Sequence, residues 1–201
     1  KGPFALIFGR GGGGGIINRV QKTPTADGFK ASGAAGINTF GAWDVSADVN
    51  APLGDTAALR INAAYEDLNN HRDYYGGERY AVNPHIAADL GAWKLGLSYE
   101  YVNDDRVTDR GIPSISGGAG KPNKPLSGHR DTFFGVPGVN RAGLEAHIVK
   151  GRVHGELASN LNWSTTLLYG DYDKYYTNVY ANGAVQADNT VKLGNYSDAT
   201  T

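Results

Sequence analysis

The sequence predicts an all-β protein, a transmembrane antiparallel β-barrel, on three observations. Seven stretches alternate apolar and polar residues, the connections between them switch between very short and long, and aromatic residues stand at the ends of several stretches. Successive side chains of a strand point to opposite faces, so each stretch has one apolar and one polar face. A barrel with lipid outside and a polar interior has this pattern.

The first three predicted strands follow one another closely. The first covers about residues 29–37, and a tight turn at 38–41 leads to the second, at 43–50. A turn at 52–55 then leads to the third, at 59–66, which shows the alternation best. Its apolar face carries Leu59, Ile61, Ala63 and Tyr65, and its polar face carries Arg60, Asn62, Ala64 and Glu66. A polar loop follows.

The next four predicted strands are less regular. The fourth, at 79–89, contains Pro84, which cannot donate to a hydrogen-bond ladder. The fifth covers 93–101, and a long irregular stretch follows from about 104 to 143. The sixth and seventh, at 149–157 and 161–169, are joined by a tight turn. A further loop is predicted from about Asp171, and an eighth strand is barely indicated.

The connections predict which way the strands run. Short turns follow strands two, four and six, and longer loops follow strands three, five and seven. Outer-membrane barrels have short periplasmic turns and long extracellular loops. Trp93 and Trp163 then stand at the periplasmic rim, and Tyr99 and Tyr101 at the outer rim. Eight residues tilted by about 40° rise roughly 20 Å, close to an apolar band of about 25 Å.

Composition narrows the classes of protein. No apolar run among the 201 residues approaches the roughly 20 residues of a transmembrane helix. The net charge of −1 gives no electrostatic case for binding nucleic acid, and the absence of cysteine removes disulfides and thiolate metal sites. The five histidines do not cluster at ligand spacing, and no catalytic set of residues is recognisable. We therefore expect neither a dedicated metal site nor an enzyme.

A soluble β-sandwich also alternates, with its apolar face in the core. A secreted β-rich adhesin or carbohydrate-binding module is therefore the alternative from another class. Two features count against it: the polar faces carry little of the Lys and Glu excess of a solvated surface, and the apolar faces are rich in Ala, Gly and aromatic residues.

Residues 2–23 differ from the rest, with an apolar run, a glycine cluster and Ile17-Asn18. The spacing of Gly9, Gly11 and Gly14 formally fits a dinucleotide motif, but a β-branched run and Pro24 follow in place of a helix. Two short strands around a glycine hinge are expected instead. The segment resembles the closing part of the plug domain of TonB-dependent outer-membrane receptors, through Gly2-Pro3, Phe8-Gly9, Gly14 and Ile17-Asn18.

Three further stretches, at 48–54, 109–113 and 131–135, resemble the siderophore-receptor branch of that family, of ferric catecholate type. The sequence departs from the pattern in its longer glycine run, in Gln21 where Thr is common, and in Gly138 where Asp is frequent. Receptors of this kind close 22 strands around a plugged lumen. The resemblance implies that residues 1–26 end the plug domain and that 27–201 form the first seven or so strands of the barrel with their extracellular loops.

The resemblance also implies a location and a function. The protein would lie in the outer membrane of a Gram-negative bacterium, in contact with lipid, and import a ferric siderophore by loop capture and plug gating. TonB, with ExbB and ExbD, would act through an N-terminal box outside this chain. No cofactor is implied, because iron arrives as a chelate. Another scarce solute, such as cobalamin or an oligosaccharide, is the alternative cargo. Both chain ends are expected to be cut, and the isolated chain, with two open sheet edges, is not expected to fold stably.

Two sets of site residues follow. Ferric catecholates are anionic and aromatic, so cationic and aromatic side chains in the loops are candidate ligand contacts. They are Arg110, His129, Arg130, Phe133, Phe134, Tyr175, Tyr176 and Tyr180. A buried plug arginine needs a carboxylate partner on the barrel wall. The predicted plug–barrel contacts are Arg10, Arg19, Glu66, Glu100 and Glu156.

Overall fold

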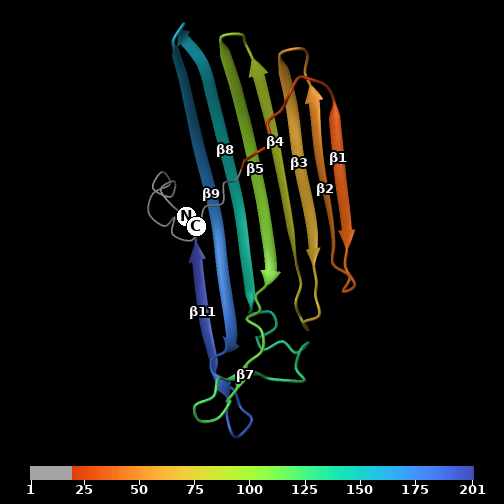
Figure 1. Ribbon diagram of the computed structural model, residues 1–201, viewed down its shortest axis with the longest axis vertical. Coiled ribbons are helices and arrows are strands. Elements are labelled where there is room, and N and C mark those ends of the chain that lie inside the picture. The colour runs from red at the N-terminus through yellow and green to blue at the C-terminus, as the bar shows by residue number, and fades with distance from the viewer. Residues whose placement is uncertain (1–19) are drawn as a thin grey trace.

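The computed structural model describes residues 20–201, which form one large antiparallel sheet and one small sheet (Figure 1). The large sheet contains eight strands in the order β1-β2-β3-β4-β5-β8-β9-β11. Their bounds are β1 Lys30–Ile37, β2 Trp43–Pro52, β3 Ala57–Leu68, β4 Gly77–Asp89, β5 Trp93–Val107, β8 Arg141–Ala158, β9 Leu161–Ala181 and β11 Leu193–Thr200. The sheet is open, with β1 and β11 at its edges.

The connections sort to the two ends of the sheet. The turns at 53–56, 90–92 and 159–160 lie at the top of Figure 1, and the other connections lie at the bottom. Within those lower connections, β6 (Ser114–Ile115) pairs with β7 (Lys124–Pro125) and with β10 (Ala184–Val185). Among residues 20–201 we find no helix that is long and apolar enough to cross a membrane. The predicted all-β antiparallel fold is confirmed.

All seven predicted strands are present; the second to fourth are two to four residues longer than predicted, and three others are extended much further. β5 continues to Val107, β8 begins at Arg141, and β9 runs to Ala181 through the region where a loop was predicted from Asp171. In the extensions of β5 and β9 apolar and polar residues do not alternate, so a search for alternation misses them. The extension of β8 does alternate, and the prediction missed it. The tyrosines and β-branched residues of 172–180 nevertheless favour a strand.

Pro84 lies inside β4, opposite Ile61 of β3. On the other side of β4, the pairing with β5 passes from Val82 to His85 without partners for Asn83 and Pro84. Proline has no N–H to donate, so the ladder is interrupted on that side while the strand continues.

A row of aromatic rings crosses one face of the sheet, which we call the outer face. Trp43 lies 4.9 Å from Tyr65, Tyr65 lies 6.5 Å from Tyr80, Tyr80 lies 5.9 Å from Tyr101, and Tyr101 lies 4.9 Å from His147, between ring centroids. The five residues come from β2, β3, β4, β5 and β8. Barrels of outer membranes carry such a girdle at the membrane interface.

A second aromatic contact lies near the short turns. Trp93 and Trp163 lie near the starts of β5 and β9, and their rings meet edge to face with centroids 5.8 Å apart. Gly155 stands directly opposite Trp93, and a Cβ there would overlap the indole ring. Because glycine has no side chain, the Trp93 ring can lie against Gly155. Both tryptophans lie beside the short turns, as predicted.

Between the two aromatic levels the outer face is apolar and open. Ile61 is 39% exposed, Leu95 39%, Leu97 54% and Leu167 73%. The fully buried hydrophobic residues of the described chain are Ala58 and Ala146 alone, too few for the core of a water-soluble sandwich. An exposed apolar face of this extent marks an interaction surface, as expected of the lipid-facing side of a barrel.

Replacing Ile61 by arginine tests this assignment. Because Ile61 lies midway along the outer face, the charge should cost about 2–4 kcal/mol of unfolding free energy in lipid. The matched control is Ala64→Arg, on the polar face of the same strand, where no large loss is expected. Urea unfolding of the complete protein in vesicles measures both, and equal losses would contradict a lipid-facing Ile61.

Candidate functional site

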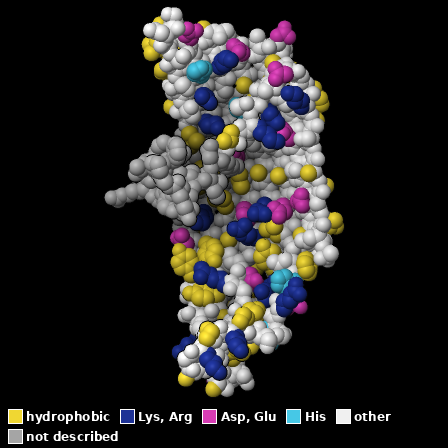
Figure 2. All heavy atoms as spheres, viewed as in Figure 1, with side chains coloured by type: hydrophobic (Ala, Val, Ile, Leu, Met, Phe, Trp, Pro, Cys, Tyr) yellow, Lys and Arg dark blue, Asp and Glu magenta, His cyan; other side chains and the backbone are white. Residues whose placement is uncertain are grey.

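The opposite face of the sheet, which we call the polar face, carries alternating charged and amide side chains. In Figure 2, Lys, Arg, Asp and Glu side chains spread over the face in view. Residues 20–28 cross this face before β1 begins (Figure 1). The contacts of the polar face with residues 20–28, and its aromatic end near the long loops, together form the candidate site.

Glu100 of β5 holds the start of that segment. It is 5% exposed and accepts hydrogen bonds from the Gln21 amide at 2.8 Å and from the Asn83 amide at 3.4 Å. Gln21 accepts a hydrogen bond from Lys150 of β8. Side chains of two strands therefore hydrogen-bond to Gln21, five residues before the predicted end of the plug domain at residue 26.

The other predicted plug–barrel residues are placed differently. Glu66 pairs with Arg79, because the register puts the two directly opposite each other on β3 and β4. Glu156 is exposed, and its side chain forms no hydrogen bond or ion pair with residues 20–201. Arg10 and Arg19 lie outside the described residues, so their contacts stay predictions.

An ionic cluster holds Lys22 and Thr23. Asp48 of β2 forms ion pairs with Lys22 at 2.6 Å and with Arg60 of β3 at 2.7 Å. Arg60 also donates to the Thr23 carbonyl at 3.1 Å. The guanidinium thus joins two wall strands to the backbone of the segment, which sequence reasoning did not predict.

Asn50 clasps the segment nearer to β1. Its side-chain oxygen accepts from the Thr25 N–H at 2.9 Å, and its amide nitrogen donates to the carbonyls of Thr25 at 2.9 Å and Gly28 at 3.0 Å. Asn50 is 1% exposed. The side-chain amide thus supplies hydrogen bonds to the backbone of Thr25 and Gly28, which lie outside the strands.

Asn50→Ala should therefore cost about 2–3 kcal/mol of unfolding free energy, because buried backbone groups lose their partners. We also expect faster proteolytic cleavage within residues 20–28. Asn62→Ala, on the same polar face and without a recorded side-chain hydrogen bond to the described residues, is the control. Both quantities are measured on the complete protein, and cleavage at the unaltered rate in Asn50→Ala would show that the clasp does not hold the segment.

Arg110 and three tyrosines gather on the polar face at the end with the long loops. The guanidinium carbon of Arg110 lies 4.9 Å from the centroid of the Tyr180 ring, a cation–π contact. Hydrogen bonding to Tyr176 raises the pKa of Arg110 above its usual value. Tyr176 packs on Tyr196 with centroids 5.8 Å apart. Hydrophobic side chains, tyrosine included, gather over this part of β9 and β11 in Figure 2.

Of the predicted ligand residues, Arg110, Tyr176 and Tyr180 are thus brought together, and Tyr196 joins them. Tyr175 is not, because neighbouring residues of β9 point to opposite faces. Its hydroxyl donates to Asp105 at 3.1 Å, and burial with that contact raises the pKa of Tyr175. Its placement in a loop was wrong, as it was for Tyr176 and Tyr180. Tyr196 was missed because β11 shows little alternation.

The remaining predicted ligand residues form a second group, in the connection between β5 and β8. His129 and Phe134 meet edge to face at 5.9 Å, and Phe133 lies 6.2 Å from Tyr74. Arg130 is exposed, and its carbonyl accepts from Arg72. These four residues thus lie in one part of the loop, and their contact with a ligand stays a prediction.

Arg72 ties the two groups together. It forms an ion pair with Asp109 at 2.9 Å and donates to the carbonyl of Thr132 at 3.0 Å. Its side chain is 11% exposed. Because Asp109 precedes Arg110, the ion pair fixes the chain next to the cation–π contact. Sequence reasoning assigned no role to Arg72.

Asn140 fastens the base of the same connection to β9. Its amide nitrogen lies 3.1 Å from the Thr108 carbonyl, 2.8 Å from the Asn178 side-chain oxygen and 2.8 Å from the Val179 carbonyl. Its oxygen accepts from the N–H groups of Val136 at 3.1 Å and Val179 at 3.0 Å. Asn140 is 1% exposed and Asn178 is fully buried.

The site offers charge, aromatic rings and hydrogen-bonding groups. Within residues 20–201, no group of three or more His, Cys, Asp or Glu side chains is placed to hold a metal ion. The arrangement suits an anionic, ring-containing ligand that approaches from the loop end. Fold and site together define a segment of a barrel-type receptor wall.

Comparisons with known proteins name the relatives of this segment. The catecholate siderophore receptor Fiu of Escherichia coli K12 is 35% identical over 146 residues, which are 71% of this chain and 18% of the relative. The metal-pseudopaline receptor CntO of Pseudomonas aeruginosa is 35% identical over 144 residues, 68% of this chain and 19% of the relative. No family model matches the chain. The chain thus spans under a fifth of the length of these curated relatives.

Solved structures share the fold. The closed form of the ferric-catecholate import receptor Fiu from E. coli K12 superposes with a TM-score of 0.73 at 23% identity, over 92% of this chain and 28% of that one. The ferripyoverdine receptor of the P. aeruginosa outer membrane gives 0.69 at 19% identity, over 88% and 24%. The chain is therefore homologous to a part of the TonB-dependent siderophore receptors.

Proposed function

We propose that this chain is part of a TonB-dependent receptor that imports a ferric siderophore, of catecholate type, across the outer membrane of a Gram-negative bacterium. The observation that carries the proposal is the placing of Arg110 against Tyr176, Tyr180 and Tyr196 on the polar face, at the loop end. A guanidinium attracts an anionic chelate, and phenol rings stack on catechol rings.

The mechanism that we propose is binding followed by gating. The extracellular loops capture the chelate, and the plug domain changes state because the chelate has different affinities for its two states. TonB, with ExbB and ExbD, then acts on an N-terminal box outside this chain. Iron enters as the chelate, so no resident cofactor and no covalent step are needed. The apolar outer face lies against lipid.

The similarity to a metal-pseudopaline receptor supports a second candidate, a metal chelate without catechol groups. Cells that express the full-length gene separate the candidates. Uptake of a radiolabelled ferric catecholate that depends on TonB is the expected result. Uptake of pseudopaline complexes alone would favour the second candidate, and uptake of cobalamin or an oligosaccharide alone would refute both.

A further inference from the structure

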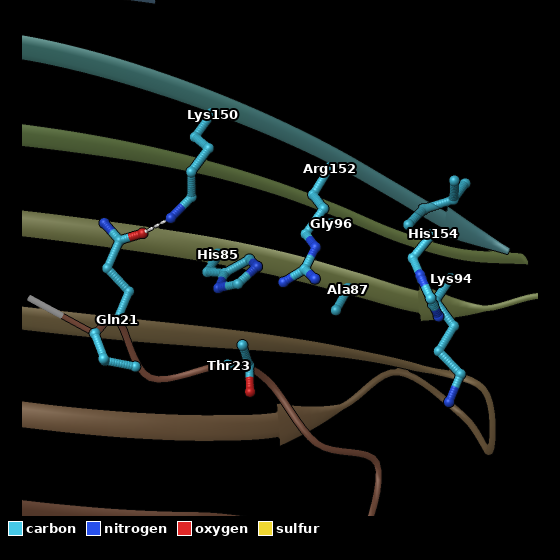
Figure 3. A pocket seen from close by; sticks show the side chains of 11 residues that line it. Gln21, Thr23, His85, Ala87, Lys94, Gly96, Lys150, Arg152 and His154 are labelled. Atoms are coloured by element: carbon cyan, nitrogen blue, oxygen red, sulfur yellow. Dashed lines mark hydrogen bonds between the residues drawn. The ribbon is translucent and has the colours of Figure 1, made fainter. Parts of the chain in front are cut away.

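A cationic cavity of about 540 Å³ lies on the polar face near the short turns. Its walls carry Lys150, Arg152 and His154, which alternate along β8, together with Lys94 of β5 and His85 of β4 (Figure 3). Gln21 and Thr23 close it from the side of residues 20–28. No Asp or Glu of the described residues lines it.

Small residues make the floor of this cavity. Gly96 stands directly opposite Arg152 on β8 and opposite Ala87 on β4. A Cβ at Gly96 would come within 3.3 Å of the His85 ring nitrogen. The two small residues therefore leave a hollow in the middle of the basic side chains, and Figure 3 shows Lys150, His85 and Arg152 around it.

The cations of this cavity are poorly compensated. Lys94 has the carboxylate of Asp89 at 3.3 Å, but Lys150 donates to the neutral amide of Gln21. The exposed side chain of Arg152 forms no hydrogen bond or ion pair with residues 20–201. Lys94 stands directly opposite His154, next to Arg152 on β8. Lys94 and Arg152 are therefore diagonal neighbours, and an anion lying between these two cations would offset their repulsion.

His154 gives an independent indication of a missing partner. Its Nδ1 atom is buried, yet it has no hydrogen-bond partner. A buried polar atom of this kind normally meets protein, water or an ion. The atom is closed to solvent, so it does not itself open into the cavity, but it shows that a side chain lining the cavity has an unmet hydrogen bond.

We propose that this cavity is an anion-binding site for a carboxylate or another anionic oxygen group, separate from the Arg110 site. His154 and Arg110 lie near opposite ends of the polar face. From His154 to Ala142, which pairs with Tyr176, the strand runs about 40 Å, so one small chelate cannot occupy both sites. Two sources can supply the anion: the anionic cargo on its way to the periplasm, which rests on the proposed function, or a carboxylate from another part of the same longer protein.

Citrate is a suitable probe, with the full-length receptor in detergent. Ala87→Glu places a carboxylate on the cavity floor without removing a cation, and Ala87→Gln is its control of equal size. The double variant Lys94→Gln/Arg152→Gln removes charge, and Lys174→Gln, on the polar face outside the cavity, is its control. The thermal midpoint is measured for each variant with and without citrate, because a ligand that binds the folded state raises it.

The outcomes separate the two sources. If the anion comes from solution, citrate raises the midpoint of the unaltered receptor and both controls. Ala87→Glu abolishes this effect, and the double variant weakens it at least tenfold. The double variant then captures ferric chelate normally at the cell surface but imports it at least tenfold more slowly. If the anion is a carboxylate of the protein, citrate has no effect and the double variant lowers the midpoint in the absence of any ligand.

Absence of both a citrate effect and a loss of midpoint in the double variant would overturn the proposal. The citrate readout does not depend on the siderophore. A receptor that binds citrate here but captures no ferric chelate would refute the proposed function and leave the anion site standing.

Discussion

Replacement of Asn140 by alanine is expected to lower the unfolding free energy by about 3–5 kcal/mol, because several buried groups lose their partner at once. The amide serves three carbonyl-type oxygens and two backbone N–H groups, and it is 1% exposed. We also expect weaker capture of ferric chelate, since Arg110 follows Thr108 by two residues and depends on the same anchor.

Two variants sharpen this prediction. Asn140→Asp keeps an acceptor for Val136 and Val179 but faces a carboxylate towards three oxygens, so it should also destabilise. Asn123→Ala removes an exposed amide from the same connection, where only a 3.4 Å contact with Ser114 is lost, and should be neutral. Urea unfolding and limited proteolysis of residues 108–140 measure the effect. Unchanged proteolysis in Asn140→Ala would show that the connection is held elsewhere.

Replacement of Arg110 by alanine is expected to weaken capture by about ten- to a hundredfold, with little change in stability. The guanidinium would attract an anionic chelate and donate charge-assisted hydrogen bonds to it, so its removal should weaken capture. Arg110→Lys should give an intermediate loss, because it keeps the charge but not the planar group that stacks on Tyr180. Binding of radiolabelled chelate to cells without energy supply measures capture alone.

Arg130→Ala is the matched control, an exposed arginine of the same connection. Its carbonyl, which Arg72 holds, remains after the substitution. The sequence alone assigned Arg110 and Arg130 equal roles, whereas the contacts to Tyr176 and Tyr180 give the larger role to Arg110. Equal losses in both variants would show that long-range charge, not the ring contact, determines capture.

The strand segments between the two aromatic levels were predictable, and the segments beyond the aromatic row were predicted less well. Residues 59–66 and 93–101 alternate because one face is apolar and the other polar. Residues 170–181 of β9 follow no such period, whereas residues 141–148 of β8 do, and the prediction missed both. The order of short turns and longer connections was also predictable, and the structure places the short turns together at one end of the sheet. Which side of the membrane each end faces stays a prediction.

The site was predictable in its chemistry but not in its geometry. Arg110, Tyr176 and Tyr180 were found from charge and rings alone. Tyr175 points to the face opposite to that of Tyr176 because both belong to β9, and the sequence had predicted a loop there. Asn50 and Asn140 gave no signal, because an amide acquires its role only when distant backbone groups, such as those of Thr25 or Val179, are brought to it.

β8 and β9 stay paired without a break from Arg141 opposite Thr177 to Glu156 opposite Asn162. The paired strands therefore form one continuous ribbon from the end of the sheet with the long connections to the end with the short turns. Bending it would break many backbone hydrogen bonds together. We therefore expect that flexing of this strand pair plays no part in the response to a bound ligand.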